Sequence, residues 1–475
     1  MKRKHFYIWL VAAMLTGGAL MSCGDDDNKK DEPNNQENTE NNQNPENNQN
    51  PENNQNPENN QNPENNQQNP ENNEGQTQRA AYTPLQTSAG TIPADAITLA
   101  DAKNPAEVLK AMGMGWNLGN QFDANNNGIS SETAWGQPKA TQATFDKVAA
   151  AGIKTVRIPV TWMGHIGAAP DYKIEDAWLD RIAEVVGYAE NAKLNAIINI
   201  HHDGSNSQNW LNIKGCATNA ALQKKTVEQV STMWKQIAEK FKDKGHFLMF
   251  ELFNEIQDGG WGWGDNRKDG GKQYAAYNEW LQASVDAIRA TGGKNTDRWL
   301  GIPAYNTNTD LSEFLVLPDD PAHKLMVSIH YYAPYEYTLE YQYQEWGHTA
   351  SKTTNYGQEK DCEAEMKKLY NRFTSKGIPV YIGEMGNVNR LSESGEKFRK
   401  YYFEYVAKCI HDNYMPAILW DNGVANAGKE CHGYFNHGTG EWMNDYSEQM
   451  IQVLVKAMTT EDASYTLQSV YDSMK

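Results

Sequence analysis

Two glutamates carry the chemistry that this sequence suggests. Glu255 follows an apolar segment, FELFN, and Glu384 lies in VYIGEMG, where two glycines let the chain turn sharply. Apolar surroundings hold the proton of a carboxyl group, which suits Glu255 to general acid catalysis. Glu251 is an alternative acid, but it lies in the body of a predicted strand, so we interpret it as a buried structural residue. Glu255 and Glu384 can then divide acid–base and nucleophilic roles in acetal hydrolysis.

Three further side chains could support this pair. Arg157, within the apolar run VRIP, is an unusual residue for a buried strand unless a carboxylate pairs with it. Such a pairing would keep Glu384 ionised. His330 and Tyr332 lie in one phase of the run SIHYY, so both point to the same side of a strand. The Tyr332 hydroxyl is then able to hold an oxygen of Glu384.

Histidines and aromatic residues suggest a sugar-binding site beside the carboxylates. His201, in the run IHHD, could hydrogen-bond a sugar or the carboxylates. Adjacent histidines with an aspartate could instead bind a metal, but His201 and His202 point to opposite faces if the strand continues, so we expect no metal. The chain has 14 Trp and 24 Tyr, and aromatic faces pack against the C–H face of a pyranose. The candidates for contact with substrate are Asn117, His202, Trp261, Trp263 and Trp420, with Trp135 and Trp162 as similar candidates and a core position as the alternative for each Trp.

Alternating strand and helix patterns begin at about residue 85 and predict a parallel sheet built from βα units. Eight segments have strand character, the number that a closed (β/α)8 TIM barrel needs. They are residues 113–118, 155–159, 196–201, 247–252, 298–303, 325–330, 380–383 and 417–420. Helical patterns cover residues 141–151, 176–192, 220–242, 274–290, 363–376 and 397–412, while 310–317 offers at most a short helix. A doubly wound open sheet is the alternative, but no Gly-rich phosphate loop opens a helix.

The predicted strands place the reactive residues together. Active sites of such barrels lie at the C-terminal ends of the strands. Polar residues recur at these ends, whereas the strand bodies are apolar. The residues at or just past the ends are Asn117, Arg157, His201, Asn254, Glu255, His330, Tyr332, Glu384 and Trp420. A protein with a purely structural role has little reason to place two glutamates, an arginine and two histidines there.

The first residues have the pattern of a secretion signal. Three basic residues precede an apolar stretch, residues 6–20, that is short for a membrane span. Cys23 follows the run LMS and resembles the lipidated cysteine of bacterial lipoproteins, and the acidic run after it resembles a surface-export signal. We expect a signal peptide in residues 1–22, a lipid anchor on Cys23, and a location on the outer membrane facing the cell exterior. A cleaved, soluble secreted protein is the alternative.

Residues 23–84 form the predicted linker. The unit NNQNPE repeats from Asn41 to Glu64 with almost no apolar residue, so this stretch cannot offset the entropy of folding. We expect a disordered spacer between the anchor and a catalytic domain over residues 85–475.

The net charge and the cysteine spacing limit which partners and metals we expect the protein to bind. A formal net charge of −18 makes nucleic acid and anionic membrane surfaces poor partners. A neutral polymer is not repelled, and we expect contact with the membrane through the lipid anchor only. The cysteines at 216, 362, 409 and 431 lack the spacing of a zinc site, and both free thiols and disulfides fit them. We expect a monomer that uses no cofactor.

Together these residues resemble family 5 of the glycoside hydrolases, the cellulase family of clan A, over about residues 100–460. The resemblance is carried by FNEI around Glu255, by GEMG around Glu384, and by the order of Arg157, His201, Asn254, His330, Tyr332 and Trp420. The run GWNLGN at 115–120 resembles a subfamily rich in endo-β-1,4-glucanases and xyloglucanases. Gln121 and Phe122 replace the Thr-Leu that often follows there.

The resemblance implies a retaining, endo-acting hydrolase of β-1,4-linked glucan backbones. Glu384 would be the nucleophile, Glu255 the acid/base, and Asn254 a ligand of the sugar 2-hydroxyl. Retaining enzymes hold their carboxyl groups about 5–5.5 Å apart, and inverting enzymes roughly 6.5–9.5 Å apart. A xyloglucanase, a mixed-linkage glucanase or a mannanase would share this mechanism. A non-catalytic glycan-binding lipoprotein is the alternative from another class, and it should have lost a carboxylate that this chain retains.

Overall fold

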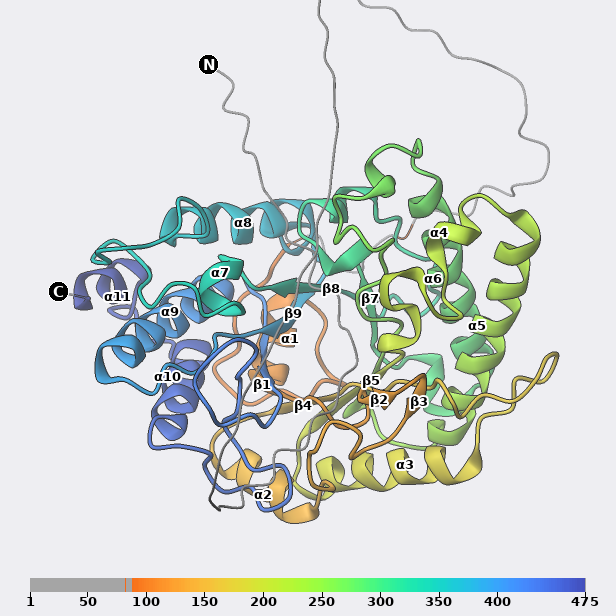
Figure 1. Cartoon of the computed structure of the whole chain (residues 1–475), viewed down its shortest axis with the longest axis horizontal. Coiled ribbons are helices and arrows are strands. Elements are labelled where there is room, and N and C mark those ends of the chain that lie inside the picture. The colour runs from red at the N-terminus through yellow and green to blue at the C-terminus, as the bar shows by residue number, and fades with distance from the viewer. Residues whose placement is uncertain (1–81, 83–87, 475) are drawn as a thin grey trace, which may run out of the picture. The chain divides into compact units, whose positions relative to one another are not determined.

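A closed barrel of eight parallel strands forms the centre of the fold (Figure 1). The computed structural model describes Tyr82 and residues 88–474. Around the barrel the strands follow the order β1-β10-β9-β8-β7-β6-β5-β4. They are β1 (Met114–Leu118), β4 (Thr155–Ile158), β5 (Asn195–Asn199), β6 (Leu248–Glu251), β7 (Leu300–Pro303), β8 (Leu325–Tyr331), β9 (Val380–Met385) and β10 (Ala417–Asp421). The predicted (β/α)8 barrel is confirmed.

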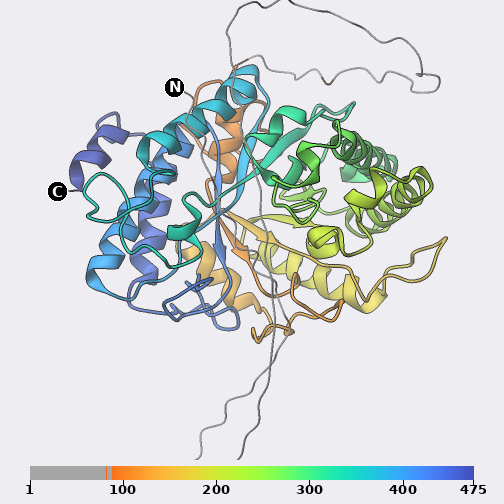
Figure 2. The same cartoon turned by 45° about the horizontal axis from the view of Figure 1, so that its top comes forward.

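Helices surround the strands, as both views of the ribbon show (Figure 2). The helices that follow barrel strands are α2 (Gln142–Ala150), α3 (Asp176–Asn191), α5 (Ala220–Phe241), α6 (Lys272–Ala290), α8 (Glu359–Arg372), α9 (Glu393–Asp412) and α10 (Ser447–Thr459). Between β7 and β8 the chain makes only two 3-10 turns, η4 (Tyr305–Thr307) and η5 (Leu311–Phe314), as the weak pattern at 310–317 predicted. The sequence analysis did not single out α10, α1 (Pro105–Met112) or α11 (Leu467–Ser473).

Shorter elements lie in the connections. They are the hairpin of β2 (Asn125–Asn126) and β3 (Ile129–Ser130), the short helices α4 (Ile213–Cys216) and α7 (Tyr335–Thr338), and the 3-10 turns η1 (His202–Ser207), η2 (Asp265–Arg267), η3 (Gly293–Thr296) and η6 (Thr374–Lys376). Side chains fix several helix starts. Asn104 accepts a hydrogen bond from the backbone of Glu107 at the start of α1, and Asn219 caps α5 in the same way.

The barrel interior changes from apolar to polar along its axis. At the N-terminal end, inward side chains of the strands pack against α1, which closes that end; the cluster includes Ile197, Met249, Met326, Ile418, Val108 and Met112. At the C-terminal end, the inward positions carry Asn117, Arg157, Asn199, Glu251, Ser328 and Glu384. The apolar end supplies stability, and the polar end is where a barrel of this type places its chemistry.

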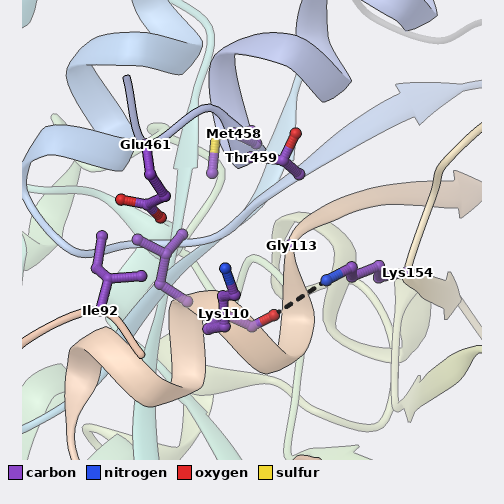
Figure 3. Close-up of a pocket in the computed structure, with 8 residues that line it drawn as sticks. Ile92, Lys110, Gly113, Lys154, Met458, Thr459 and Glu461 are labelled. Atoms are coloured by element: carbon purple, nitrogen blue, oxygen red, sulfur yellow. Dashed lines mark hydrogen bonds between the residues drawn. The ribbon is translucent and has the colours of Figure 1, made fainter. Parts of the chain in front are cut away.

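A small pocket lies at the apolar end of the barrel (Figure 3). Its lining comes from α1, from the residues preceding β1 and β4, and from the end of α10, and it includes Lys110, Gly113, Lys154, Met458 and Glu461. The Lys154 ammonium donates to the backbone oxygen of Lys110 at 3.4 Å. Because this pocket adjoins the N-terminal ends of β1 and β4, it is separate from the polar end.

The predictions for the N-terminal region remain largely predictions. The signal peptide, Cys23 and most of the linker lie outside the described residues. Tyr82, inside the predicted linker, has its ring 5.8 Å from that of His323. Within the described part of the chain, no helix is long and apolar enough to cross a membrane. The cysteines at 216, 362, 409 and 431 are buried free thiols.

Candidate active site

A β-bulge in β9 turns Glu384 into the barrel. Ile329 of β8 pairs with Ile382, but the next residue, His330, pairs with Glu384, so Gly383 is an extra residue in the ladder. With strict alternation Tyr381 and Gly383 would point inward; the bulge lets Tyr381 and Glu384 do so instead. A Cβ at Gly383 would lie 2.8 Å from the Ser328 hydroxyl, so only glycine fits this position.

Glu384 receives two hydrogen bonds at the polar end of the barrel. Arg157 donates from Nη1 to Oε1 at 2.7 Å, and the Tyr332 hydroxyl donates to Oε2 at 3.0 Å. Both partners were predicted from the sequence, and the Arg157 guanidinium is fully buried. The positive charge and the hydroxyl proton both favour the ionised form of Glu384, the form that a nucleophile needs.

Arg157 is the hub of the site. Its Nη1 also donates to Asn117 at 2.9 Å, its Nη2 to Asn254 at 2.8 Å, and its Nε to Glu251 at 2.8 Å. Burial opposes its charge, but Glu251 and Glu384 raise the pKa of Arg157 above its ordinary value. One permanently charged side chain thus fixes four partners, which come from β1, from β6 and the segment after it, and from β9.

Glu251 is the buried structural acid that its place in the strand predicted. Besides Arg157, three neutral donors hold its carboxylate: Asn199 at 2.8 Å, Ser328 at 2.8 Å and Tyr381 at 2.7 Å. Burial opposes ionisation, but the charge of Arg157 and these bonds bring the pKa of Glu251 below its ordinary value. With its oxygens occupied on all sides, Glu251 is unable to exchange a proton with a substrate.

Glu255 lies four residues beyond the end of β6, in the loop before α6, and it contacts His330. Nδ1 of His330 is 2.7 Å from Oε1 of Glu255 and 3.6 Å from Oε2 of Glu384. The Glu255 side chain is 26% exposed, against 8% for Glu384, so Glu255 is the carboxyl group that water reaches more easily. His330 therefore stands between the two carboxylates and links their protonation.

The pKa values of the two carboxyl groups shift in opposite directions. Burial opposes ionisation of Glu255, yet the hydrogen bond from His330 and its charge bring the pKa of Glu255 below its ordinary value. Burial raises the pKa of Glu384, and the charge of Glu255 adds to this, while His330 and Arg157 oppose it. Burial thus acts on Glu255 in the expected direction, but the contacts with His330 outweigh it. Arg157 and Tyr332 donate to Glu384 and make no hydrogen bond to Glu255, so their contacts favour the ionised form of Glu384.

The spacing of the carboxylates is short. One oxygen of Glu255, one oxygen of Glu384 and a nitrogen of His330 all lie within 4.8 Å of one another. So close an approach of two oxygens agrees with the about 5–5.5 Å between the carboxyl groups of retaining enzymes. The three groups could also surround a cation, but the His330 nitrogen nearest Glu255 is already hydrogen-bonded to it. The geometry favours direct attack by one carboxylate and proton transfer by the other.

His201 and His202 lie on the other side of the site, and they face each other. The strand ends at Asn199, so the predicted opposite orientation is wrong: their rings are 4.4 Å apart, edge to face. Together with Asp123 they offer three ligand atoms within 4.8 Å of one another. However, Asn199 donates to Nδ1 of His201 at 3.0 Å, which places the remaining proton on Nε2 and leaves no lone pair there for a metal. Burial lowers the pKa of both histidines, that of His202 to about 4.

The predicted aromatic residues divide into three groups. Trp420 is half-buried at the end of β10. Its ring is parallel to that of His201 at a centroid distance of 6.2 Å, and we call these two rings the floor of the site. Trp261 and Trp263, in the loop that follows Glu255, are 49% and 51% exposed. Trp135 is 37% exposed, with its ring 5.8 Å from that of His202. Trp162 is fully buried and donates to the backbone of Asn199, so the prediction that it stacks on sugar is wrong.

Asn117 also needs correction. It was predicted to contact substrate, but it is fully buried, donates to the backbone oxygens of Gly383 and Leu419, and accepts from Arg157. Its role is to position Arg157 and the bulge. Asn254 differs: Arg157 holds its amide oxygen, while its Nδ2 has no hydrogen bond within the described part of the chain and faces the site as a donor.

Some residues of the site were missed. Asn199, Ser328 and Tyr381 hold Glu251, and Asp123 lies 3.9 Å from His202. Strand alternation would have found two of them, because Asn199 and Ser328 precede His201 and His330 by two residues. Burial raises the pKa of Asp123 to about 7. The unusual Gln121 and Phe122 are both fully buried, so they do not shape the surface that a substrate meets.

Known proteins resemble this chain in sequence and fold. Residues 119–426 match the family Cellulase (glycosyl hydrolase family 5). Endoglucanase A of Paenibacillus barcinonensis is 35% identical over 67% of this chain and 82% of its own length. The xyloglucan-specific endo-β-1,4-glucanase of Bacteroides ovatus is 35% identical over 66% of this chain and 64% of its own. A solved GH5-4 broad specificity endoglucanase from Bacteroides salanitronis is 49% identical, covers 81% of this chain and 100% of that one, and superposes with a TM-score of 0.74.

Proposed function

Because the chain belongs to glycosyl hydrolase family 5, the cellulase family, we propose that it hydrolyses β-1,4-linked glucan chains internally, with retention of anomeric configuration. The observation that carries the mechanism is the short spacing of Glu255 and Glu384, with Arg157 and Tyr332 donating to Glu384 and not to Glu255. That asymmetry assigns the nucleophile to Glu384 and the proton donor to Glu255.

The reaction then proceeds in two displacements. Glu384 attacks the anomeric carbon while Glu255 protonates the departing glycosidic oxygen, which gives a covalent glycosyl–enzyme ester. Glu255, now ionised, takes a proton from water as the water attacks the same carbon, and Glu384 leaves as a carboxylate. Nδ1 of His330 lies 2.7 Å from Glu255 and so contacts the carboxyl group whose charge changes in both steps. Asn254, with its oxygen fixed by Arg157, is oriented to donate from Nδ2 to a sugar hydroxyl.

Substrate contacts around this centre are proposals that rest on exposure and position. Trp420 and His201 form a floor for the sugar at the cleavage point, with His202 and Trp135 beside it. Trp261 and Trp263 extend the aromatic surface along the loop after Glu255, where a long chain would continue. An unsubstituted or mixed-linkage glucan suits these platforms. Xyloglucan is the second candidate, because a 35% identical relative from Bacteroides ovatus is specific for it.

The decisive test is sugar release from barley glucan, carboxymethylcellulose, xyloglucan and mannan. We expect reducing ends from the glucans with a rapid fall in viscosity, and NMR should show the β-anomer first. Glu384→Ala should lose at least about a thousandfold in kcat, and azide should restore turnover as a glycosyl azide of inverted anomeric configuration. Near-normal activity of that variant would contradict the nucleophile assignment. A folded protein that binds glucan and cuts none would instead be a glycan-binding protein.

We further propose that the enzyme works at the cell surface, held by lipid on Cys23 through the repeat-rich linker, as a monomer with no contact to nucleic acid. The proposal rests on the signal pattern before Cys23 and on the composition of residues 28–79. Labelling of cells with a fatty acid analogue should mark the wild-type protein. Cys23→Ser should be unlabelled and should leave the membrane fraction; equal labelling of both would refute lipidation at this residue.

A further inference from the structure

A buried histidine beyond β10 contacts the tyrosine that donates to Glu384. The ring of His432 is fully buried and lies 6.4 Å from the ring of Tyr332, with the two ring planes at 68°. Such an edge-on arrangement is favourable for aromatic rings. The Tyr332 hydroxyl donates to Oε2 of Glu384 at 3.0 Å. His432 therefore stands one side chain away from Glu384 and touches a group that holds its carboxylate.

The chain just after β9 brings the two rings together. Gly386 lies two residues beyond Glu384, and a Cβ at Gly386 would be 3.0 Å from Nδ1 of His432 and 3.2 Å from Cε1 of Tyr332. A larger residue would crowd both rings, so glycine permits this close packing. The rings of His432 and Tyr332 thus pack against the same backbone segment that carries Glu384.

The backbone of His432 is held independently of Tyr332. Its amide donates to Oδ1 of Asn422 at 3.1 Å, and its carbonyl oxygen accepts from the Asn422 amide at 3.3 Å. The carbonyl oxygen of Cys431 accepts from the backbone amide of Asn389 at 2.8 Å. Because Asn422 directly follows β10 and Asn389 lies shortly after β9, two neighbouring barrel strands fix the place of the His432 ring.

The His432 ring contributes a surface and no hydrogen bond. Within the described part of the chain, neither of its ring nitrogens has a hydrogen-bond partner. Burial lowers the pKa of His432 to about 3, and the charges of Arg399 and Arg390 add to this shift, so the ring is uncharged at neutral pH. Buried polar atoms are normally hydrogen-bonded. Packing is therefore the interaction that His432 offers to Tyr332.

Tyr332 has few other contacts that could hold its ring. It follows the last residue of β8 and is half-buried. Among residues 88–474, its hydroxyl makes one hydrogen bond, the one to Glu384, and His432 is the one aromatic ring in contact with it. A hydrogen bond weakens steeply when the donor turns away from its acceptor. The bond to Glu384 thus depends on whatever keeps the Tyr332 ring from rotating.

We propose that His432 is a positioning residue for the nucleophile, because its ring holds the Tyr332 ring at the angle that directs the hydroxyl to Glu384. The inference rests on the proposed glucanase function and extends it to a residue that does not reach the substrate. It requires an aromatic surface at position 432 and makes no use of the imidazole nitrogens.

The test compares His432→Ala with His432→Phe. His432→Ala leaves a cavity beside Tyr332, so kcat on barley glucan should fall about three- to thirtyfold. KM should stay within about twofold, since a buried residue does not contact the polymer. The acid limb of kcat should move to higher pH, because a weaker hydrogen bond favours ionised Glu384 less. His432→Phe keeps a ring and should retain the wild-type acid limb and kcat within about threefold.

Tyr332→Phe supplies the internal comparison. Arg157, His330 and Glu255, the other charged groups at Glu384, are the same in all variants. The double variant Tyr332→Phe, His432→Ala should have the kcat of Tyr332→Phe within about twofold, because the bond that His432 supports is already gone. Multiplied losses in the double variant would overturn the proposal. So would a His432→Ala variant with wild-type kcat and acid limb, or a His432→Phe variant as impaired as His432→Ala.

The matched control is His437→Ala. His437 is also a fully buried histidine between β10 and α10, but it packs against Trp116 at 5.3 Å and pairs with Asp421 at 3.3 Å. Since Asn117 points into the barrel, its neighbour Trp116 points out of it. His437→Ala should therefore lose stability while kcat and its acid limb stay as in the wild type, at a temperature where all variants are folded.

Titration of Glu384 by 13C NMR measures the effect without turnover. The Glu384 signal is assigned by its absence in Glu384→Gln. Its pKa should be higher in His432→Ala than in the wild type and unchanged in His432→Phe. An unchanged pKa in His432→Ala would refute the role of His432 even in a protein that cuts no glucan. A wild type that cuts no glucan, with the expected pKa change present, would refute the proposed function alone.

Discussion

Replacing Glu251 by glutamine should damage both stability and catalysis, although Glu251 does not reach the substrate. The variant keeps the size of the side chain and removes the charge that faces Arg157 inside the barrel, where both groups are 0% exposed. Breaking a buried ion pair from one side costs about 3–5 kcal/mol, because the remaining charge is left without its partner. The glutamine amide would also oppose one of the three neutral donors, Asn199, Ser328 or Tyr381.

This loss in the free energy of unfolding corresponds to a lower melting temperature, Tm. At about 2.1 cal/mol/K per residue, a barrel of roughly 390 residues has an unfolding entropy near 0.8 kcal/mol/K, so the loss corresponds to a Tm lower by about 4–6 °C. The lowered pKa of Glu251 sets the pH dependence. A depressed carboxyl pKa contributes stability above the unfolded value of about 4.5, and this is lost as the pH falls through the folded value. The difference in Tm between the wild type and Glu251→Gln should therefore be constant above about pH 5 and become smaller below it.

Catalysis supplies the second readout. Without Glu251, Arg157 loses its Nε partner and shares its charge with Glu384 alone, so the pKa of Glu384 falls. We expect kcat on barley glucan to drop about 10- to 100-fold and the acid limb of its pH profile to move to lower pH. The matched control is Glu396→Gln, since Glu396 forms a buried ion pair with Arg399 at 3.0 Å on α9.

The control should lose comparable stability and keep kcat within about twofold at a temperature where both variants are folded. If Glu251→Gln behaves like the control in kcat, the hub role of Arg157 is wrong. If its Tm is unchanged, the reasoning about the buried pair is wrong.

Three further variants test single contacts. Tyr332→Phe removes one hydrogen bond to Glu384, worth about 1.5–3 kcal/mol to a charged group, so kcat should fall about 10- to 100-fold and the acid limb should move to higher pH, measured with barley glucan. His330→Ala removes the bond and charge that lower the pKa of Glu255, so the basic limb of kcat/KM should move to higher pH; a shift to lower pH would contradict the coupling. Trp420→Ala should raise KM for glucan oligosaccharides about tenfold, about 1.4 kcal/mol, and an unchanged KM would remove it from the sugar floor.

The sequence predicted those parts of the site that depend on strand order and alternation. Apolar, β-branched runs marked all eight strands, and the rule that chemistry collects at strand C-termini brought Arg157, Tyr332 and Glu384 together before any geometry was known. Period-two alternation was sufficient for Tyr332, because β8 runs without interruption to Tyr331. The same rule failed for His201 and His202, because β5 ends at Asn199 and alternation stops there.

Other features depend on contacts that no local pattern encodes. The bulge at Gly383 is visible only when β8 and β9 are paired, and it decides that Glu384 points inward. Asn117 looked like a substrate ligand because it ends a strand, yet its three hydrogen-bond partners lie 40, 266 and 302 residues away in sequence.

The way Arg157 shares its charge explains why a third acid, Glu251, pairs with the same arginine as the nucleophile. If Arg157 paired with Glu384 alone, a full positive charge at 2.7 Å would stabilise the carboxylate strongly and make it a poor nucleophile. Glu251 takes part of that charge at 2.7 Å, and its own second oxygen is saturated by Ser328 and Tyr381. Burial, together with the charge of Glu255, can then raise the pKa of Glu384 against the opposing charges of His330 and Arg157. Glu251 thus affects the reactivity of Glu384 as well as the stability of the barrel around it.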